Sequence, residues 1–244
     1  MSTISVFKDL DELSTKAAEE FVRIANDAIE KRGQFSIALS GGSTPKALHA
    51  KLVHTQIDWS KVSFFFGDER NVAFDHKDSN FRMADETLFQ QLGIAAGNIH
   101  RWKTELAEPE EVAVEYSDII TASSPLAYPD GSELPRFDLI LLGMGSDGHT
   151  ASLFPNTKAL HEKEKLTLAN WVPQLDTWRY TLTFPVLNNA ANIMFLVAGV
   201  DKAESLKEVI EGERRPDELP SQMINPTNGE IFWFLDEAAA RLLG

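Results

Sequence analysis

The sequence of 244 residues predicts one α/β domain, residues 1–244, in which helices cover both faces of a doubly wound, mostly parallel sheet. Two observations lead to this fold class. Short apolar runs typical of buried strands alternate with segments of helical periodicity, and no linker or internal repeat interrupts them. Three of these runs end in polar, mostly glycine-rich segments. Since ligands of such sheets bind at the carboxyl ends of the strands, we expect the ligand site there.

The N-terminal half of the chain should contain strands at residues 4–7, 35–39 and 62–66. The first helix is expected between Asp9, which can cap it together with Glu12, and Gly33, which can end it. Its buried face should consist of apolar residues at helical spacing, namely Leu13, Ala17, Phe21, Ile24 and Ala28. A second helix should follow residues 40–45 and run to about Val53, with Pro45 in its first turn, and a third should span residues 80–92.

The C-terminal half continues the alternation. Strands are expected at residues 138–142, 180–184, 192–197 and 231–234, and helices at residues 109–122, 203–210 and 237–243. Prolines and a glycine make residues 123–136 an expected loop. Residues 156–178 break the alternation, and we expect them to flank the ligand site.

The charge and composition narrow the range of partners. A formal net charge of −14 disfavours nucleic acid and anionic lipid, because such a surface repels phosphate groups. The chain has no cysteine, which excludes disulfides and thiolate-bound metals. Because neither a signal peptide nor an apolar run of spanning length is visible, we expect a cytoplasmic protein, and no obligate protein partner is evident.

The segment Ser40-Gly41-Gly42-Ser43-Thr44-Pro45 is the first candidate for ligand binding. A strand, a glycine-rich turn and a helix start form an anion site, in which backbone N–H groups point at the ligand. Gly41, Gly42, Ser43 and Thr44 are therefore candidate phosphate-binding residues. The alternative is a tight turn with a serine or threonine helix cap. The segment is not a Walker loop, because it lacks the Gly-Lys pair.

The segment Gly143-Met144-Gly145-Ser146-Asp147-Gly148-His149 follows another expected strand. It matches the G-x-G-x-x-G pattern of dinucleotide sites, but Pro155 leaves too little room for the helix that this pattern requires. His149 is the candidate general base, and Asp147 could fix its tautomer. The alternative is a surface histidine. The backbone of Gly143, Gly145 and Gly148 is a candidate for holding an oxyanion.

Charged residues supply the remaining candidates. Asp68, Glu69 and Arg70 follow the strand at residues 62–66, where two carboxylates and an arginine could form an acid/base pair with a phosphate clamp or, equally, a surface salt bridge. Asp68 and Arg70 are the candidate substrate-binding residues among them. Arg179 and Lys202 could add positive charge for a phosphate, or could be solvated surface residues. The spacing of the histidines predicts no metal site.

Four segments together resemble the 6-phosphogluconolactonase family: SGGSTP at residues 40–45, FGDER at 66–70, SNFRMA at 79–84 and GMGSDGHTASLFP at 143–155. Their order is that of the family, and they span most of the chain. One small departure is Phe81, where the family commonly has tyrosine. The resemblance implies hydrolysis of 6-phospho-D-glucono-1,5-lactone to 6-phosphogluconate in the oxidative pentose phosphate pathway, without a metal or cofactor.

The resemblance also implies roles for single residues. His149 would activate water, Asp147 would orient it, and Arg70 and Arg179 match the phosphate-binding arginines best. Glucosamine-6-phosphate deaminases are the nearest competitor. They have glutamate where this chain has Phe154 and tyrosine where it has Arg70, and both differences favour the lactonase. A non-catalytic sensor of sugar phosphates is a further alternative.

Overall fold

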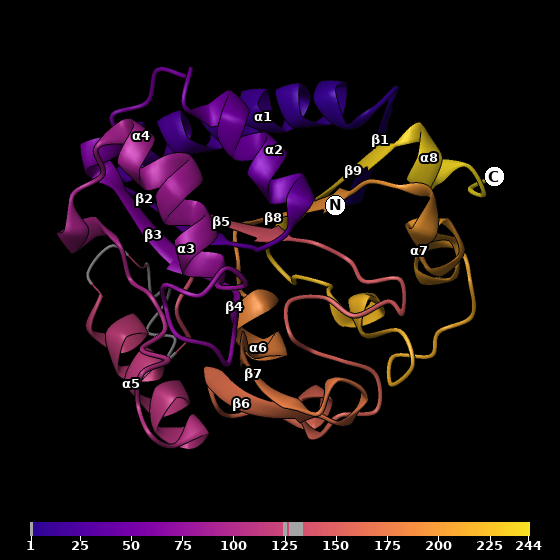
Figure 1. Cartoon of the computed structure of the whole chain (residues 1–244). Helices are drawn as coiled ribbons and strands as arrows, with labels where there is room; N and C mark the ends of the chain where they lie inside the picture. Colours follow the sequence, from indigo (N-terminus) through magenta and orange to yellow (C-terminus); the bar gives the residue numbers. More distant parts are fainter. Residues whose placement is uncertain (1, 124–125, 127–133) are drawn as a thin grey trace.

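Two sheets organise the chain in the computed structural model, which describes all residues except 1, 124–125 and 127–133 (Figure 1). The larger sheet has six parallel strands in the order β1, β9, β8, β5, β2, β3. Their bounds are β1 Ser2–Phe7, β2 Phe35–Leu39, β3 Val62–Phe66, β5 Leu139–Leu142, β8 Asn192–Val197 and β9 Glu230–Asp236. The predicted parallel sheet is thereby confirmed.

The strand order places a crevice between β2 and β5. After β2 the chain moves to β3 on one side, whereas after β5 it moves to β8 on the other. Ligands bind at such a switch point, outside the carboxyl ends of the strands. The glycine-rich turn at residues 40–42 follows β2, and residues 143–149 follow β5, so the topology brings these two segments together.

Helices cover both faces of the central sheet (Figure 1). Figure 1 shows α1 to α4 above the sheet and α5, α6 and α7 below it. The α-helices are α1 Leu10–Arg32, α2 Ser43–Leu52, α3 Asn80–Ala84, α4 Gln90–Leu92, α5 Pro109–Ala122, α6 Phe184–Leu187, α7 Ala203–Ile210 and α8 Glu237–Ala240. A π-helical turn, η2 Asp85–Phe89, joins α3 to α4. The expected helix at residues 80–92 therefore forms with a wider turn in its middle.

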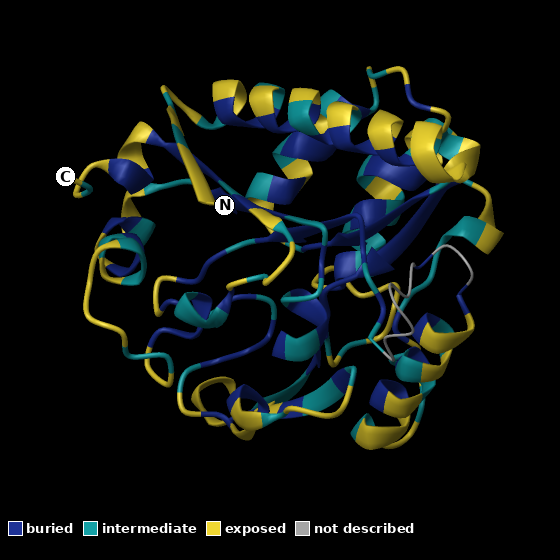
Figure 2. Cartoon of the chain, turned by 180° about the vertical axis from the view of Figure 1, so that it is seen from behind, coloured by how far each residue is buried: buried dark blue, intermediate teal, exposed yellow. Residues whose placement is uncertain are grey.

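The first helix forms for the predicted reasons. The Asp9 carboxylate accepts a hydrogen bond from the Glu12 amide at 3.0 Å, and Gly33 ends the helix in the left-handed conformation. The reciprocal bond of a capping box shifts by one residue, because Glu12 accepts from the Lys8 amide at 2.8 Å. Figure 2 shows the outer face of α1 exposed and its inner face buried against the sheet.

A small antiparallel sheet was not predicted. It contains β4 Asp68–Arg70, β7 Thr177–Leu182 and β6 Thr167–Val172, in the order β4, β7, β6. The expected strand at residues 180–184 is wrong in its bounds, because it starts three residues earlier and Phe184 already begins α6. Residues 156–178, which break the alternation of the sequence pattern, contain β6. Most of the expected loop at residues 123–136 lies outside the described residues.

One hydrophobic core unites the described elements. The strands of the central sheet supply its centre, with Ile37, Phe64, Leu141 and Phe195 fully buried, and the large aromatic side chains of Trp102 and Tyr116 also belong to it. In the described part of the chain, no helix has the length and apolar character needed to cross a membrane.

Candidate active site

A cavity of about 200 Å³ lies at the carboxyl ends of the strands, at the switch point between β2 and β5. It brings together segments that are far apart in the sequence. Its lining residues are Ser40, Gly41, Asp68, Arg70, Gly143, Met144, Gly145, His149, Ala151 and Lys202. Six of the residues predicted from the sequence for binding or catalysis besides His149 thus share one cavity, namely Gly41, Asp68, Arg70, Gly143, Gly145 and Lys202.

His149 and Asp147 form a bonded pair beside this cavity. The His149 Nδ1 and Asp147 Oδ1 atoms are 2.6 Å apart, and the His149 amide also donates to this oxygen at 3.2 Å. Partial burial raises the pKa of the Asp147 carboxyl, but the hydrogen bonds and the charge of His149 together outweigh this effect and lower the pKa below its ordinary value. The aspartate therefore stays ionised and holds the imidazole in one orientation.

Two neighbours restrict the imidazole further. Phe154 stacks on it, with the ring centroids 4.0 Å apart and the planes 23° from parallel. Gly145 approaches it from another side, where an added Cβ would lie 2.1 Å from His149 Nδ1. The pair thus requires glycine at residue 145, and His149 is not the freely rotating surface histidine that the sequence left open.

The backbone of this loop is largely engaged in its own hydrogen bonds. The Gly145 amide donates to the His149 carbonyl at 2.9 Å, and the Gly148 amide donates to the Gly145 carbonyl at 3.0 Å. The structure therefore does not support the prediction that these two amides hold an oxyanion, since each already has an acceptor. The Gly143 carbonyl accepts from Thr150 Oγ1 at 2.9 Å.

Arg70 and Arg179 lie side by side, although they are distant in the sequence. They are register partners in the antiparallel pair of β4 and β7. Burial lowers the pKa of the Arg179 guanidinium, and the like charge of Arg70 lowers it further. In the described part of the chain neither arginine has a carboxylate partner, and Arg70 Nη1 donates to the Asp78 carbonyl at 2.6 Å. Two adjacent cations without a carboxylate form a suitable site for an anion.

The salt bridge that the sequence left open within residues 68–70 is absent from the described residues. Glu69 points the other way, into the core, where its carboxylate accepts from the amides of Asn80 and Phe81 at 2.7 and 2.9 Å. Burial raises the pKa of Glu69, in opposition to these bonds. Glu69 thereby anchors the start of α3 behind the cavity, while Asp68 and Arg70 face the cavity.

The glycine-rich turn provides one wall. Gly41 lines the cavity, and Gly42 is the N-cap of α2 without a side-chain cap bond, so the serine or threonine cap considered from the sequence is wrong. Ser43 and Thr44 begin α2 but do not line the cavity. Lys202 also lines the cavity, and its Nζ lies 3.0 Å from Asp201 Oδ2.

Sequence reasoning missed several lining residues. Ala151 has a φ of 48°, an unusual conformation for a residue with a side chain, and no sequence pattern announces it. Ser40 and Met144 lie inside the predicted segments and could have been included from their position alone. Among the described residues, no group of three or more histidine, aspartate or glutamate side chains could hold a metal ion.

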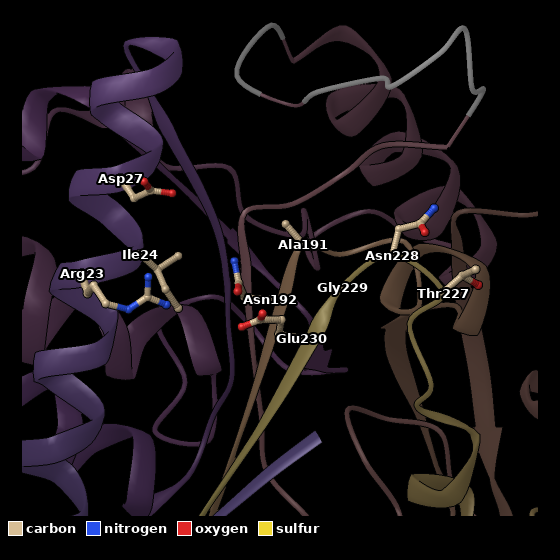
Figure 3. A pocket seen from close by; sticks show the side chains of 9 residues that line it. All are labelled: Arg23, Ile24, Asp27, Ala191, Asn192, Thr227, Asn228, Gly229 and Glu230. Carbon is tan, nitrogen blue, oxygen red and sulfur yellow. The ribbon is translucent and has the colours of Figure 1, made fainter. Parts of the chain in front are cut away.

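A larger cavity of about 460 Å³ lies at the opposite edge of the sheet, at the starts of β8 and β9 (Figure 3). Figure 3 shows its charged side chains, Arg23, Asp27 and Glu230. Arg23 already forms a salt bridge with Glu20. Because this edge carries the amino ends of the strands, the smaller cavity beside His149 is the better candidate for the active site.

The fold and the smaller cavity together define an α/β protein with a ligand site at the carboxyl edge of its sheet. The chain belongs to the family described as glucosamine-6-phosphate isomerases/6-phosphogluconolactonase, whose sequence pattern matches residues 8–233. This finding confirms the family resemblance inferred from the four sequence segments.

Individual relatives agree with this assignment. The chain is 43% identical to a 6-phosphogluconolactonase of Synechocystis over 217 residues, which cover 88% of each protein. It is 38% identical to a probable 6-phosphogluconolactonase of Arabidopsis thaliana, with 98% of this chain and 93% of the relative covered. The solved 6-phosphogluconolactonase of Trypanosoma brucei superposes with a TM-score of 0.86 at 28% identity, with 100% and 99% covered. A monomeric glucosamine-6-phosphate deaminase, at 19% identity and a TM-score of 0.78, shares the fold.

Proposed function

We propose that this chain hydrolyses 6-phospho-D-glucono-1,5-lactone to 6-phosphogluconate, the second step of the oxidative pentose phosphate pathway, with His149 as the base that activates water. The names of the relatives support the reaction. The observation that supports the base is the 2.6 Å contact between His149 Nδ1 and Asp147 Oδ1 beside the cavity. The ligand is thus a small phosphorylated sugar lactone.

In this mechanism the Asp147 carboxylate accepts a hydrogen bond from Nδ1–H, so that Nε2 keeps its lone pair for the reaction. Nε2 takes a proton from a water molecule as the water oxygen attacks the lactone carbonyl carbon. The tetrahedral intermediate then expels the ring oxygen, which takes the proton back from the imidazolium. The products are a carboxylic acid, which ionises, and a hydroxyl group. Asp147 stabilises the imidazolium between these two steps.

Arg70 and Arg179 would hold the phosphate, together with the first amides of α2 and the hydroxyls of Ser43 and Thr44. The first amides of a helix lack an acceptor within the helix, so they suit an anion. Lys202 would add a further charge. For the oxyanion we keep Gly143 as the proposed donor, because the amides of Gly145 and Gly148 already donate within the loop.

The test is the disappearance of freshly generated lactone over time, corrected for spontaneous hydrolysis. His149→Ala should lower kcat by about 10²–10⁴-fold, the usual contribution of a positioned base, with KM nearly unchanged. His54→Ala, at an exposed histidine, is the matched control. Near-normal turnover by His149→Ala would refute its role as the base.

Two further measurements separate the competing functions. Phe154 cannot transfer protons, and it stacks on His149 where the deaminases are expected to have glutamate. Ammonia release from glucosamine-6-phosphate would reveal a deaminase. Binding of 6-phosphogluconate without turnover of the lactone would indicate a sensor.

We also propose a cytoplasmic location, without a nucleic acid, a membrane or an obligate protein as partner. The net charge of −14 supports the first two exclusions. One relative in rice is named as chloroplastic, so fractionation of the source cells is the appropriate test of location. Recovery of the protein with an organelle would contradict the proposal.

A further inference from the structure

We propose that Asp68 selects the hydroxylated ring of the substrate by accepting hydrogen bonds from its hydroxyl groups, with Ser152 and Asn80 as positioning residues that orient the Asp68 carboxylate. The inference rests on the proposed lactone hydrolysis and adds a specificity determinant to it. Its basis is the buried carboxylate of Asp68, which lines the cavity. Each of its two oxygens accepts a hydrogen bond from an uncharged side chain.

Asp68 faces the ligand cavity from β4. Alternate residues of a strand share a face, so Asp68 and Arg70 point to the same side, and both line the cavity with His149. Only 8% of Asp68 is exposed, and it lines the cavity. A carboxylate in this position must either meet donors of the ligand or remain partly unsatisfied.

Two side chains hold the carboxylate, one on each oxygen. Ser152 Oγ donates to Asp68 Oδ2 at 2.7 Å, and Asn80 Nδ2 donates to Asp68 Oδ1 at 3.2 Å. Both residues are only 1% exposed. Neither donor is charged, so the negative charge of Asp68 is not neutralised by them. A carboxylate offers about four acceptor positions, so roughly two remain for a ligand.

The chemistry of the cavity decides which part of the substrate meets Asp68. A phosphate is repelled by a carboxylate and is attracted to Arg70, so it belongs at the other end of the binding site. The ring hydroxyls are neutral and can donate, and an ionised carboxylate only accepts. Asp68 therefore matches the hydroxylated ring, and the opposing charges of Asp68 and Arg70 set the direction in which the substrate lies.

Ser152 connects this acceptor to the catalytic loop. It lies three residues after His149, and its amide donates to Thr181 Oγ1 at 3.3 Å, while its carbonyl accepts from Asn170 Nδ2 at 3.0 Å. Thr181 is in turn the register partner of Asp68. The hydroxyl acceptor is thus held at a fixed place relative to the base.

Asn80 connects the same acceptor to the glycine-rich turn. Its Nδ2 also donates to the Asp68 carbonyl at 3.0 Å. Its Oδ1 packs against Gly41, where an added Cβ would lie 1.7 Å from this oxygen. Because Oδ1 is buried without a partner among the described residues, the side-chain hydrogen bonds of Asn80 within them go to Asp68.

The experiment compares kcat/KM for 6-phosphogluconolactone with that for its 2-deoxy and 3-deoxy analogues. The parent protein should favour the hydroxylated lactone over at least one analogue by about tenfold or more, because a deoxy ligand leaves a buried acceptor unpaired. Asp68→Asn should reduce this preference to within about threefold, mainly by losing activity on the hydroxylated lactone. Ser152→Ala and Asn80→Ser should reduce the preference partly while Asp68 is present. Ser14→Ala removes a buried serine of α1 whose hydroxyl donates to the Leu10 carbonyl, and it should keep the preference.

The proposal would be overturned if Asp68→Asn kept the parent's preference for the hydroxylated lactone. It would also be overturned if Asp68→Asn lowered kcat/KM equally for all three lactones. If Asp68→Asn does not fold, the kcat/KM ratio of Ser152→Ala for the hydroxylated and deoxy lactones decides instead, and an unchanged ratio would overturn the proposal. If the folded parent protein turns over no lactone, the proposed function fails by itself. The affinities of 6-phosphogluconate and its 2-deoxy analogue then test Asp68: equal affinities would overturn its role, and tighter binding of the hydroxylated acid would support it.

Discussion

Arg70 and Arg179 show how single residues create a positive site within an acidic protein. Burial lowers the pKa of the Arg179 guanidinium, and the like charge of Arg70 lowers it further. In the absence of a carboxylate partner among the described residues, an anionic ligand is the group that would relieve this repulsion. A chain with a net charge of −14 can thus concentrate positive charge where the substrate is proposed to bind.

Removal of Arg179 should therefore affect binding more than chemistry. Arg179→Ala should raise KM by about 10–100-fold, the equivalent of one charge-assisted hydrogen bond, and change kcat by less than about threefold. Arg179→Lys should recover part of the loss, because it restores the charge without the two-pronged geometry. Steady-state kinetics on the lactone give both constants. Arg214→Ala, at an exposed arginine, is the control, and a fall in kcat alone would argue against phosphate binding.

At the scale of elements, the loop between β5 and Ala151 depends on close packing around the imidazole. Gly145→Ala would place a methyl group 2.1 Å from His149 Nδ1 and 2.4 Å from Asp147 Oδ1. Because the two side chains must move apart, kcat should fall by about 10²-fold or more. Gly97→Ala is the matched control, since nothing lies within 4 Å of its added Cβ. Unchanged kcat in Gly145→Ala would show that the pair does not need its observed geometry.

Elements with a simple apolar pattern could be predicted from the sequence almost to the residue. The strands β2, β3 and β8 and the helices α5 and α7 have the expected bounds. The strand β4 could not be predicted, because its three residues, Asp68, Glu69 and Arg70, are all charged. It forms because β7 pairs with it and because the core contacts of Glu69 hold it in place.

At the scale of the whole molecule, the topology explains why the segments of the site could be predicted from the sequence, whereas the contacts between their side chains could not. A parallel sheet gathers all its carboxyl ends at one edge, so the sequence indicated which segments meet there. It gave no sign of the contact between Ser152 and Asp68, which are 84 residues apart. The structure supplies these partners through the small sheet, which the apolar pattern did not reveal.

The buried side chain of His49 makes the free energy of unfolding depend on pH. This residue is fully buried between α2 and η2, and its Nδ1 lies 2.8 Å from Thr87 Oγ1. Since the Thr87 hydroxyl donates its one hydrogen to the Met83 carbonyl, it must accept a hydrogen bond from Nδ1–H of His49. Protonation would therefore add a proton at Nε2, which is buried without a partner among the described residues. Burial accordingly lowers the pKa of His49 from 6.5 to about 4.

The pH dependence of folding follows from this shift. Between pH 6.5 and about 4 the unfolded chain binds a proton at His49 that the folded protein does not, so the free energy of unfolding falls as the pH falls. The full shift is equivalent to about 3 kcal/mol, which is lost progressively below pH 6.5 and retained above it. Urea denaturation from pH 4 to 8 should show a smaller loss on the acid side for His49→Met than for the parent protein, because methionine cannot titrate. The exposed variant His76→Met should keep the slope of the parent. Equal slopes for His49→Met and the parent would mean that His49 is protonated in the folded protein, and that the packing between α2 and η2 admits the charge.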